Sequence, residues 1–278
     1  MIKIHIFDRR VIKRYLEVSS AVFTGISAIF LFVDIPADFK LKIGISIAVF
    51  ILLVYIVIWW KANGLQNVSL NIDGSTVSIK TGDIFSQDGL KVIAFNEYFD
   101  TLVDDRVIAK RSLNGIFIEK YLDISVSQFD QYLSEFPFDE NEILDRSVKR
   151  RIGKSVRYRL GTIFLYKDFI LTAFSRFDDN NKAYLTMPEY LEFLINFWDS
   201  VNRVYAQKSV STTIFGSGIT RIKGHKNISD EELLKIMLWT FRISEMRFKY
   251  PAKLTIVIHP EKIDQINLLD VMSAKHGV

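Results

Sequence analysis

Four histidines are the first residues to consider as chemical groups, because imidazole is a common general base and metal ligand. His5, His225, His259 and His276 lie far apart, and none stands at metal-ligand spacing from another histidine or from a group of carboxylates. The chain also lacks the G-x-S-x-G, Walker A and H-E-x-x-H patterns. A Ser–His–Asp hydrolase and a metal site therefore have little support, and we expect no resident metal or cofactor.

Two short glycine-containing loops are better candidates, because backbone N–H groups in such loops bind phosphates. Residues 81–85 (TGDIF) follow a predicted strand, and Asp83 is placed there to accept a hydrogen bond from an exocyclic amine. Residues 215–220 (FGSGIT) follow another predicted strand, and Arg221 and Lys223 come next, where they add positive charge. Taken singly, each loop is better explained as an ordinary turn, and the two cations as a solvated face.

Turn signals and periodicity predict the elements that position these loops. Helical spacing predicts a helix at Ser127–Phe136. A capping box of Thr186 and Glu189 predicts the start of a second helix, and one of Ser229 and Glu232 the start of a third. Because strands and helices alternate and some strands form hairpins, we expect a layered α/β body with a mixed sheet. The predicted strands are Val68–Ile72, Thr76–Lys80, Leu90–Phe95, Gly161–Leu165, Phe169–Phe177, Lys182–Met187, Val210–Phe215 and Leu254–His259.

The composition limits the possible classes of function. Lys and Arg number 36 and Asp and Glu 32, so the net charge of +4 is too balanced to indicate a nucleic-acid partner. The absence of Cys excludes a disulfide scaffold, a Cys-ligated zinc site and a thiol nucleophile. The mean hydropathy of +0.16 is high for a chain with 24% charged residues, so the apolar residues must be concentrated in one region.

That region is the first 60 residues. Leu41–Trp60 carries a single charge, Lys42, at its edge, and twenty helical residues reach about 30 Å, the thickness of a bilayer core. Trp59, Trp60 and Lys61 form a typical interfacial anchor. The alternative is a buried core helix, which we disfavour because five helical turns apolar on every face are rare in a small domain.

Leu16–Val33 is a weaker candidate span, because it contains Glu17 and three serines. A cleaved signal peptide and an interfacial helix are the alternatives. With the later span it predicts a transmembrane hairpin over residues 15–61, with helices at about 16–33 and 41–60. Its small residues fit against a partner helix, and Glu17 is either an ionisable functional group or a solvated one. These small residues are Ser20, Thr24, Gly25 and Ala28.

The basic flanks predict the orientation. Residues 1–14 carry five cations, and Lys61 follows the second span. The positive-inside rule therefore places the N-terminus and residues 62–278 in the cytoplasm. The apolar residues among the first twelve also fit a segment that lies on the membrane surface.

The motifs of the body, in this order, resemble the macro-domain family. Gly82-Asp83-Ile84 matches its G-D-[IV] motif, and Val92–Asn96 matches the strand that ends in N-A-A-N. Ser112–Gly115 and Gly216–Thr220 match its two glycine-containing loops, and Leu254–Ile258 matches its last strand. The resemblance covers residues 75–265 and implies a three-layer α/β/α fold with a mixed sheet.

One branch of the family is more similar still. The strings KTGDIFSQDGLKVIAFNEYFDTLVDD and SLNGIFIEKY, behind two membrane helices, are similar to macro-domain effectors of type II Thoeris anti-phage systems. The resemblance implies a sensor and effector rather than an enzyme. It implies activation by an ADP-ribose-derived signal, such as histidine-ADP-ribose, made by a partner TIR-domain NADase. Such effectors then form homo-oligomers and damage the bacterial inner membrane.

The resemblance also implies a set of ligand-binding residues. Asp83 and Ile84 correspond to the positions that contact adenine, and Asn96 to the one near the distal ribose. The positions that embrace the pyrophosphate and distal ribose correspond to Asn114, Gly115, Gly216, Ser217, Gly218, Ile219, Thr220 and Arg221.

Two departures from the family pattern bear on catalysis. Residues 103–106 (VDDR) stand where hydrolytic macro domains carry a run of glycines, and Ile93 replaces the first Asn of N-A-A-N. Both changes remove groups that position the scissile bond and a water. The alternative interpretation is a membrane-tethered ADP-ribosyl hydrolase, which would need another water-positioning group near Asn96 or Asn114. A structural anchor with a vestigial pocket is the third. Asp104 and Asp105 either meet a cationic group of the ligand or serve as a cap or solvated turn.

Overall fold

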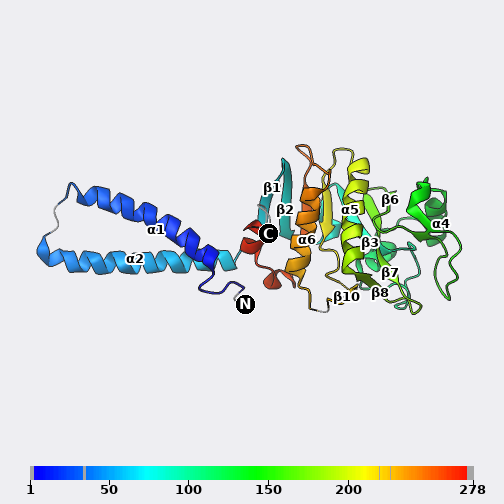
Figure 1. Ribbon diagram of the computed structural model, residues 1–278, viewed down its shortest axis with the longest axis horizontal. Helices are drawn as coiled ribbons and strands as arrows, with labels where there is room; N and C mark the ends of the chain where they lie inside the picture. The colour runs from blue at the N-terminus through cyan, green and yellow to red at the C-terminus, as the bar shows by residue number, and fades with distance from the viewer. Residues whose placement is uncertain (1–2, 34–35, 219, 226, 274–278) are drawn as a thin grey trace. The chain divides into compact units, whose positions relative to one another are not determined.

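The computed structural model describes residues 3–33, 36–218, 220–225 and 227–273 (Figure 1). Ile219, one of the predicted site residues, lies outside the described residues, as does the side chain of Arg221. The chain forms two compact units: residues 1–66 together with 264–270, and a larger unit that holds residues 67–263. The first unit thus extends beyond the predicted boundary at residue 61 and includes a segment that the sequence analysis assigned to the body.

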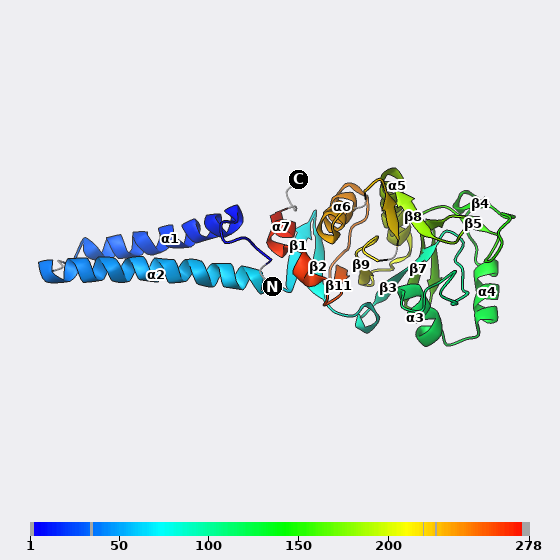
Figure 2. The same cartoon turned by 90° about the horizontal axis from the view of Figure 1, so that it is seen from below.

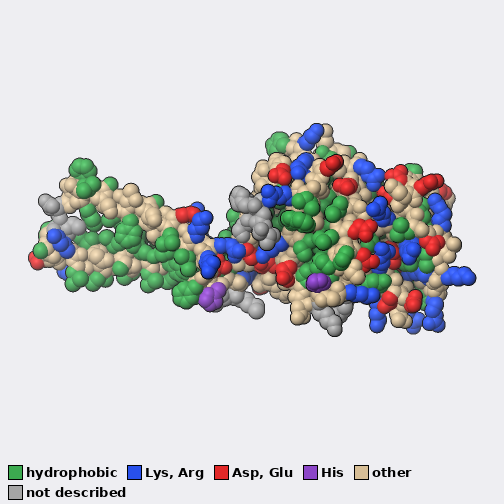
Figure 3. All heavy atoms as spheres, in the orientation of Figure 1, with side chains coloured by type: hydrophobic (Ala, Val, Ile, Leu, Met, Phe, Trp, Pro, Cys, Tyr) green, Lys and Arg blue, Asp and Glu red, His purple; other side chains and the backbone are tan. Residues whose placement is uncertain are grey.

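Helix α2 (Ala37–Asn63) is the described helix that is long and apolar enough to cross a membrane. Its 27 residues reach about 40 Å, which exceeds the thickness of a bilayer core. None of its most apolar stretch is buried within the chain, and Figure 3 shows hydrophobic side chains on its surface. This exposure argues against a core helix and supports the span predicted at 41–60.

The earlier span predicted at 16–33 is not supported. Helix α1 runs from Arg9 to Phe30, and its first nine residues carry four cations and Glu17. The uncharged remainder, residues 18–30, reaches about 20 Å, which is too short to cross a bilayer core. A multi-pass topology therefore has no support in the described part of the chain.

The outer face of α1 carries the polar and small residues that the sequence analysis singled out. Glu17 is exposed and lies 3.3 Å from Arg14. Helix α1 instead packs on α2 through another face, which buries Val11 and Ser19. The small residues are exposed, and Gly25 has no atom within 4 Å of the position of a Cβ. They are Ser20, Thr24, Gly25 and Ala28.

The basic N-terminal segment is docked within the first unit. Ile4 and Val11 are buried in a small cluster with Ala62, and the Trp59 indole N–H donates to the Ile4 carbonyl at 2.9 Å. The Asn63 side chain accepts from the Ile4 N–H at 3.0 Å. Ile4 and Val11 are therefore docked against α2, whereas Ile6 and Phe7 of the same segment stay exposed.

The C-terminal segment of the first unit is held by ion pairs. Lys3 lies 3.2 Å from Asp264, and Arg10 pairs with Asp270. Leu269 packs on the cluster of Ile4 and Val11. The elements here are η4 (Ile263–Gln265) and α7 (Leu268–Ser273).

The larger unit is built on a mixed sheet in the order β1-β2-β11-β9-β3-β7-β8-β10, with β6 paired to β7. Strands β2, β11, β9, β3 and β7 run parallel, whereas β1, β6 and β8 pair antiparallel with their neighbours β2, β7 and β7. Strand β10 is parallel to β8. The bounds are β1 (Asn67–Ile72), β2 (Ser75–Thr81), β3 (Leu90–Asn96), β6 (Ile163–Tyr166), β7 (Phe169–Phe177), β8 (Ala183–Thr186), β9 (Val210–Thr213), β10 (Arg221–Lys223) and β11 (Leu254–Ile258).

Helices cover both faces of the sheet, which gives the three layers expected (Figure 2). One face carries α5 (Met187–Val204) and α6 (Asp230–Ile243), and the other carries α3 (Leu113–Ile116) and the π-helix η2 (Phe117–Tyr121). Helix α4 (Val126–Glu135) packs beyond η2. The short elements are η1 (Ile84–Ser86), η3 (Glu140–Glu142) and a separate two-stranded sheet of β4 (Ile143–Asp145) and β5 (Arg157–Tyr158).

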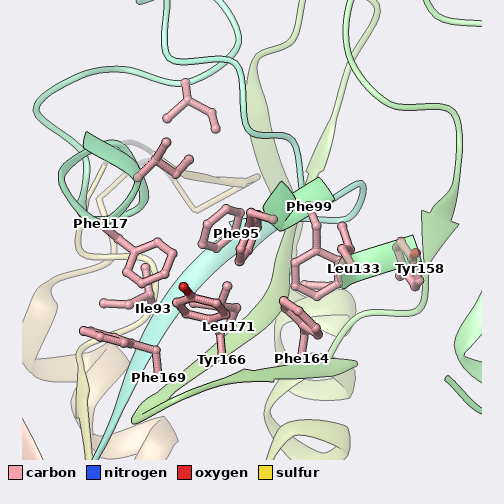
Figure 4. Packing of buried hydrophobic residues seen from close by; sticks show 14 of the residues in the cluster. Ile93, Phe95, Phe99, Phe117, Leu133, Tyr158, Phe164, Tyr166, Phe169 and Leu171 are labelled. Atoms are coloured by element: carbon pink, nitrogen blue, oxygen red, sulfur yellow. The ribbon is translucent and has the colours of Figure 1, made fainter. Parts of the chain in front are cut away.

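The core beneath α3 and η2 is largely aromatic (Figure 4). Phe117 of η2 contacts Phe95 of β3 and Phe169 of β7, with ring centroids 6.2 and 4.9 Å apart. Phe99, from the loop after β3, packs edge-on against Tyr158 at 5.2 Å. These buried rings fix the loop after β3 and the helix α3–η2 against the sheet.

The elements predicted from local signals are confirmed within one to three residues. Both capping boxes are present: the Thr186 side chain accepts from the Glu189 N–H, and the Ser229 side chain from the Glu232 N–H. The hairpin of β1 and β2 turns at Asp73 and Gly74. The π-helix was not predicted, since helical periodicity does not distinguish a π-helix from an α-helix.

Candidate functional site

Four loops meet at one edge of the sheet. Because β2, β11, β9 and β3 are adjacent and parallel, the loops that follow them emerge at the same carboxyl edge. These loops are residues 82–89, 97–112, 214–220 and 259–263. The sheet thus brings together both candidate loops found in the sequence, and it adds the turn after β11.

The loop after β2 holds Asp83 at the surface. Its carboxylate Oδ1 accepts from the Phe85 N–H at 3.0 Å and caps η1, and the side chain is exposed. The neighbouring Ile84 side chain is buried in the core, so only its backbone is available to a ligand. The Gly82 N–H donates to the Ile258 carbonyl at 3.0 Å and ties this loop to the end of β11.

Asn96 ends β3 but does not present a free amide. The register between β3 and β7 shifts between Phe95 and Asn96, and the Asn96 side chain is buried. Its Oδ1 accepts from the Tyr98 N–H at 2.9 Å, and its Nδ2 donates to Asp100 at 3.1 Å. The irregularity turns this side chain inward, so the structure uses Asn96 to shape the loop after β3.

An ion pair that sequence reasoning missed fixes the same loop. The buried Asp100 carboxylate accepts from both terminal nitrogens of Arg150, at 3.1 and 2.8 Å, and from the Lys154 N–H at 2.7 Å. The Arg150 guanidinium lies over the Tyr98 ring at 3.8 Å from its centroid. No local pattern marks this pair, because its residues are 50 positions apart.

The acidic residues of this loop are engaged in its backbone. Asp104 accepts from the N–H groups of Arg106 and Val107 at 2.9 and 2.7 Å, and these bonds, that of Val107 above all, lower the pKa of its carboxyl. Asp105 accepts from the Lys110 N–H at 2.9 Å. Both side chains therefore cap the turn, which is one of the two interpretations that the sequence left open.

A second buried carboxylate stands next to the loop after β3. Glu97 pairs with Arg176 at 2.7 Å, and Arg176 also contacts Glu189 at 2.6 Å. Burial raises the pKa of Glu97, although Arg176 acts in the opposite direction. This network joins β3, β7 and α5 and engages the Glu97 carboxylate in ion pairing.

Asn114 and Gly115 lie at the start of α3, which follows the loop after β3, and Asn114 is half-buried whereas Gly115 is buried. Ser112 caps the helix, since its hydroxyl accepts from the Gly115 N–H at 3.2 Å, and it contacts the Asn114 side chain at 2.5 Å. A Cβ on Gly115 would lie 2.4 Å from the Ala109 carbonyl oxygen, so only glycine fits there. Gly115 therefore lets the helix start close against the loop after β3.

The loop after β9 turns at Gly216, whose φ of +84° favours glycine. Ser217 and Thr220 are half-buried, and Gly218 is exposed with open space around it. Lys262, from the turn after β11, donates to the Ser217 carbonyl. Lys262 was not among the predicted site residues, because nothing in the sequence places it near residue 217.

A cavity of about 560 Å³ lies beside the loop after β3. Its walls are mainly apolar and come from that loop, η2 and α4, and none of the residues predicted to bind ligand lines it. The lining residues are Thr101, Leu102, Val103, Ile118, Glu119, Val126 and Asp130. The predicted residues thus form an open edge rather than this cavity.

Among the described residues, no group of three or more His, Asp or Glu side chains is placed to hold a metal ion. The edge instead offers a carboxylate at one loop and glycines, backbone groups and an ammonium at two others. This set is suited to an adenine amine and a diphosphate.

The layered sheet and the loops at its carboxyl edge define a domain of the macro-domain class. A family model described as "Thoeris protein ThsA, Macro domain" matches residues 77–259. A Thoeris protein ThsA from Bacillus amyloliquefaciens (strain Y2) is 39% identical over 256 residues, which cover 91% of this chain and 85% of that protein. The chain belongs to the ThsA macro-domain family of Thoeris proteins.

Solved macrodomain structures from Oceanobacillus iheyensis are also similar. One with ADP is 13% identical and covers 76% of this chain and 94% of its own, with a TM-score of 0.41. Another with MES bound is 14% identical and covers 76% of this chain and 95% of its own, with a TM-score of 0.40.

Proposed function

We propose that this chain is a membrane-anchored sensor and effector of anti-phage defence. Its macro domain binds an ADP-ribose-derived signal, such as histidine-ADP-ribose, that a TIR-domain NADase makes. Binding then drives assembly into homo-oligomers and disruption of the bacterial inner membrane. The observation that carries the proposal is the meeting of the loops after β2, β9 and β11 at one edge, in a chain of the ThsA family.

The ligand is positioned by loops of different chemistry. The exposed carboxylate of Asp83 accepts from the adenine amino group, and the backbone at Ile84 meets the ring. The backbone of Gly216, Ser217 and Gly218 faces the diphosphate, where the open space at Gly218 admits phosphate oxygens. Asn114 and Gly115, at the start of α3, face the distal ribose.

The membrane orientation rests on the first unit. Lys61 follows Trp59 and Trp60 at the C-terminal end of α2. This aromatic anchor and its cation support a cytoplasmic location for that end of the helix and for the macro domain that follows it.

The proposal assigns sensing rather than hydrolysis. The described polar groups near the loop after β3 are engaged: Asn96 with Asp100, Asp104 and Asp105 with backbone N–H groups, and Glu97 with Arg176. A hydrolase needs a group that is free to position water at the distal ribose. Because these side chains are already hydrogen-bonded or ion-paired, we expect the bound ligand to be released without being cleaved.

The test is a calorimetric titration of full-length protein in detergent with ADP-ribose and with histidine-ADP-ribose. Mass spectrometry of the cell contents then shows whether the ligand is intact. We expect binding and intact ligand; cleaved ligand would favour the hydrolase, and absence of binding by a folded protein would leave only the anchor.

Substitution of Asp83 tests the adenine assignment. Asp83→Ala should weaken binding about 10- to 150-fold, since a hydrogen bond to a charged group contributes about 1.5–3 kcal/mol. Asp83→Asn keeps an acceptor for the Phe85 N–H and serves as a control for the cap of η1. Affinity of Asp83→Ala within twofold of the unchanged protein would place adenine elsewhere.

Gly218 gives a test that does not disturb folding. A methyl group at Gly218 meets open space, so Gly218→Ala should leave the melting temperature unchanged and yet weaken binding, because the methyl occupies the space of a phosphate oxygen. Gly25→Ala, also in open space but on α1, is the matched control. Equal affinities of both variants would remove residues 216–220 from the site.

A further inference from the structure

Lys262 occupies a position that the sequence did not indicate. It lies in the turn after β11, where its N–H donates to the His259 carbonyl at 2.8 Å. Its ammonium donates to the Ser217 carbonyl and lies 2.9 Å from the Asp230 carboxylate. A side chain from one loop of the edge thus reaches the loop that follows β9.

The sheet order places this turn between the two halves of the proposed site. Strand β11 lies between β2 and β9, so the turn after β11 separates the loop of Asp83 from the loop of residues 214–220. The Lys262 side chain is 35% exposed, whereas that of Asp230 is 12% exposed. About a third of the Lys262 side chain is therefore open to solvent, whereas its partner is largely covered.

The neighbouring helix cannot supply the positive field that a diphosphate needs. Helix α6 starts next to the loop, but its first turn carries Asp230, Glu231 and Glu232, and three carboxylates oppose the positive end of the helix dipole. The loop's own backbone N–H groups are uncharged. Lys262 brings a full positive charge to this point.

We infer that Lys262 is the diphosphate-contacting cation of the site, held ready by Asp230 and the Ser217 carbonyl. The inference rests on the proposed function, because it takes the ligand to be an ADP-ribose-type nucleotide. When the diphosphate binds the loop, the ammonium turns from Asp230 to a phosphate oxygen. Lys262 then sets the preference for diphosphates over uncharged nucleosides.

The competing explanation is that Lys262 is only a structural link, or clip, that joins the loop after β9 to the start of α6 through Ser217 and Asp230. The two explanations predict opposite effects for Asp230. If Lys262 is only a clip, loss of either partner loosens the loop and weakens ligand binding. If the ammonium contacts phosphate, removal of the Asp230 charge frees it and removes a repelling carboxylate, so binding becomes tighter.

The experiment titrates ADP-ribose into full-length protein and its Lys262→Met, Lys262→Arg and Asp230→Asn variants. Thermal unfolding of each variant checks the fold. We expect about tenfold weaker binding for Lys262→Met, near-normal binding for Lys262→Arg, and binding several-fold tighter for Asp230→Asn. Added salt should weaken binding by Lys262→Met less steeply than binding by the unchanged protein.

A second lysine–aspartate pair provides the control. Lys208 lies 3.5 Å from Asp168, and these residues precede β9 and β7, at the opposite edge of the sheet. Lys208→Met and Asp168→Asn should change affinity less than twofold.

Three outcomes would overturn the inference. Unchanged affinity in Lys262→Met shows that the ammonium does not meet the ligand, and weaker binding in Asp230→Asn shows that the pair is only a clip. If Lys262→Met fails to fold, the direction of the Asp230→Asn effect still decides between the two. Failure of the unchanged protein to bind ADP-ribose would overturn the proposed function as well, which distinguishes that result from the other two.

Discussion

Substitution of Asp100 by Asn should destabilise the protein strongly, although it preserves the shape of the side chain. The Asp100 carboxylate is 1% exposed. It accepts from both terminal nitrogens of Arg150, from the Lys154 N–H and from the Asn96 amide, at 2.7 to 3.1 Å. Asn removes the negative charge and replaces one acceptor by a donor, which faces the other donors.

The size of the effect follows from the burial of Arg150. Its side chain is 9% exposed, so the guanidinium cannot recover its lost partner from water. An unpaired buried charge costs about 3–5 kcal/mol, a large share of the total stability of about 5–15 kcal/mol of a typical domain. The stacking of Arg150 on Tyr98 remains and does not replace the charge.

Urea unfolding of full-length protein in detergent, followed by tryptophan fluorescence, measures the loss. Arg150→Met and the double variant complete a double-mutant cycle, in which the double loss should be well below the sum of the single losses. Asp168→Asn, in the exposed pair with Lys208, is the control and should cost less than about 1 kcal/mol. A loss below about 1 kcal/mol for Asp100→Asn, or additive losses in the cycle, would refute the reasoning.

Three further predictions concern other parts of the fold. Gly115→Ala should lower stability by about 1–3 kcal/mol, because the new methyl would lie 2.4 Å from a backbone oxygen; a melting temperature equal to that of Gly25→Ala would contradict this. Hydrogen bonds from the backbone and hydroxyl of its N-cap serine lower the pKa of Glu232. The stability that the ionised Glu232 carboxylate adds to the fold is therefore complete above the unfolded pKa of 4.5, and it is lost as the pH falls through the lowered folded pKa. Glu232→Gln does not titrate, so its stability deficit relative to the unchanged protein should shrink between pH 5 and pH 3, and a constant deficit in pH-dependent melting would exclude this cause. Lys3→Glu should loosen the segment held by Asp264 and speed its cleavage by protease, and Lys3→Glu with Asp264→Lys should restore resistance; equal cleavage of the single and double variants would show that the pair does not hold the segment.

Local sequence signals were sufficient wherever a short stretch decides its own structure. The apolar run of Leu41–Trp60 marks α2 because a membrane-length helix needs only that composition. The strand Leu90–Phe95 and the capping boxes of Thr186 and Ser229 were predicted correctly, since alternation and caps depend on neighbouring residues alone. The same reasoning overestimated Leu16–Val33, where the charges at the start of α1 leave too few apolar residues for a span.

Only the tertiary structure decided how the candidate site is assembled. Asn96 is a plausible ligand contact in the sequence, but a register shift between β3 and β7 turns it inward toward Asp100. Arg150 and Lys262 carry no local signature, because their partners lie 50 and 45 positions away. The order of strands in the sheet brings such residues together, and that order depends on packing across the whole domain. The sequence alone therefore determined which loops carry suitable chemistry, whereas the fold determined which side chains are free to use it.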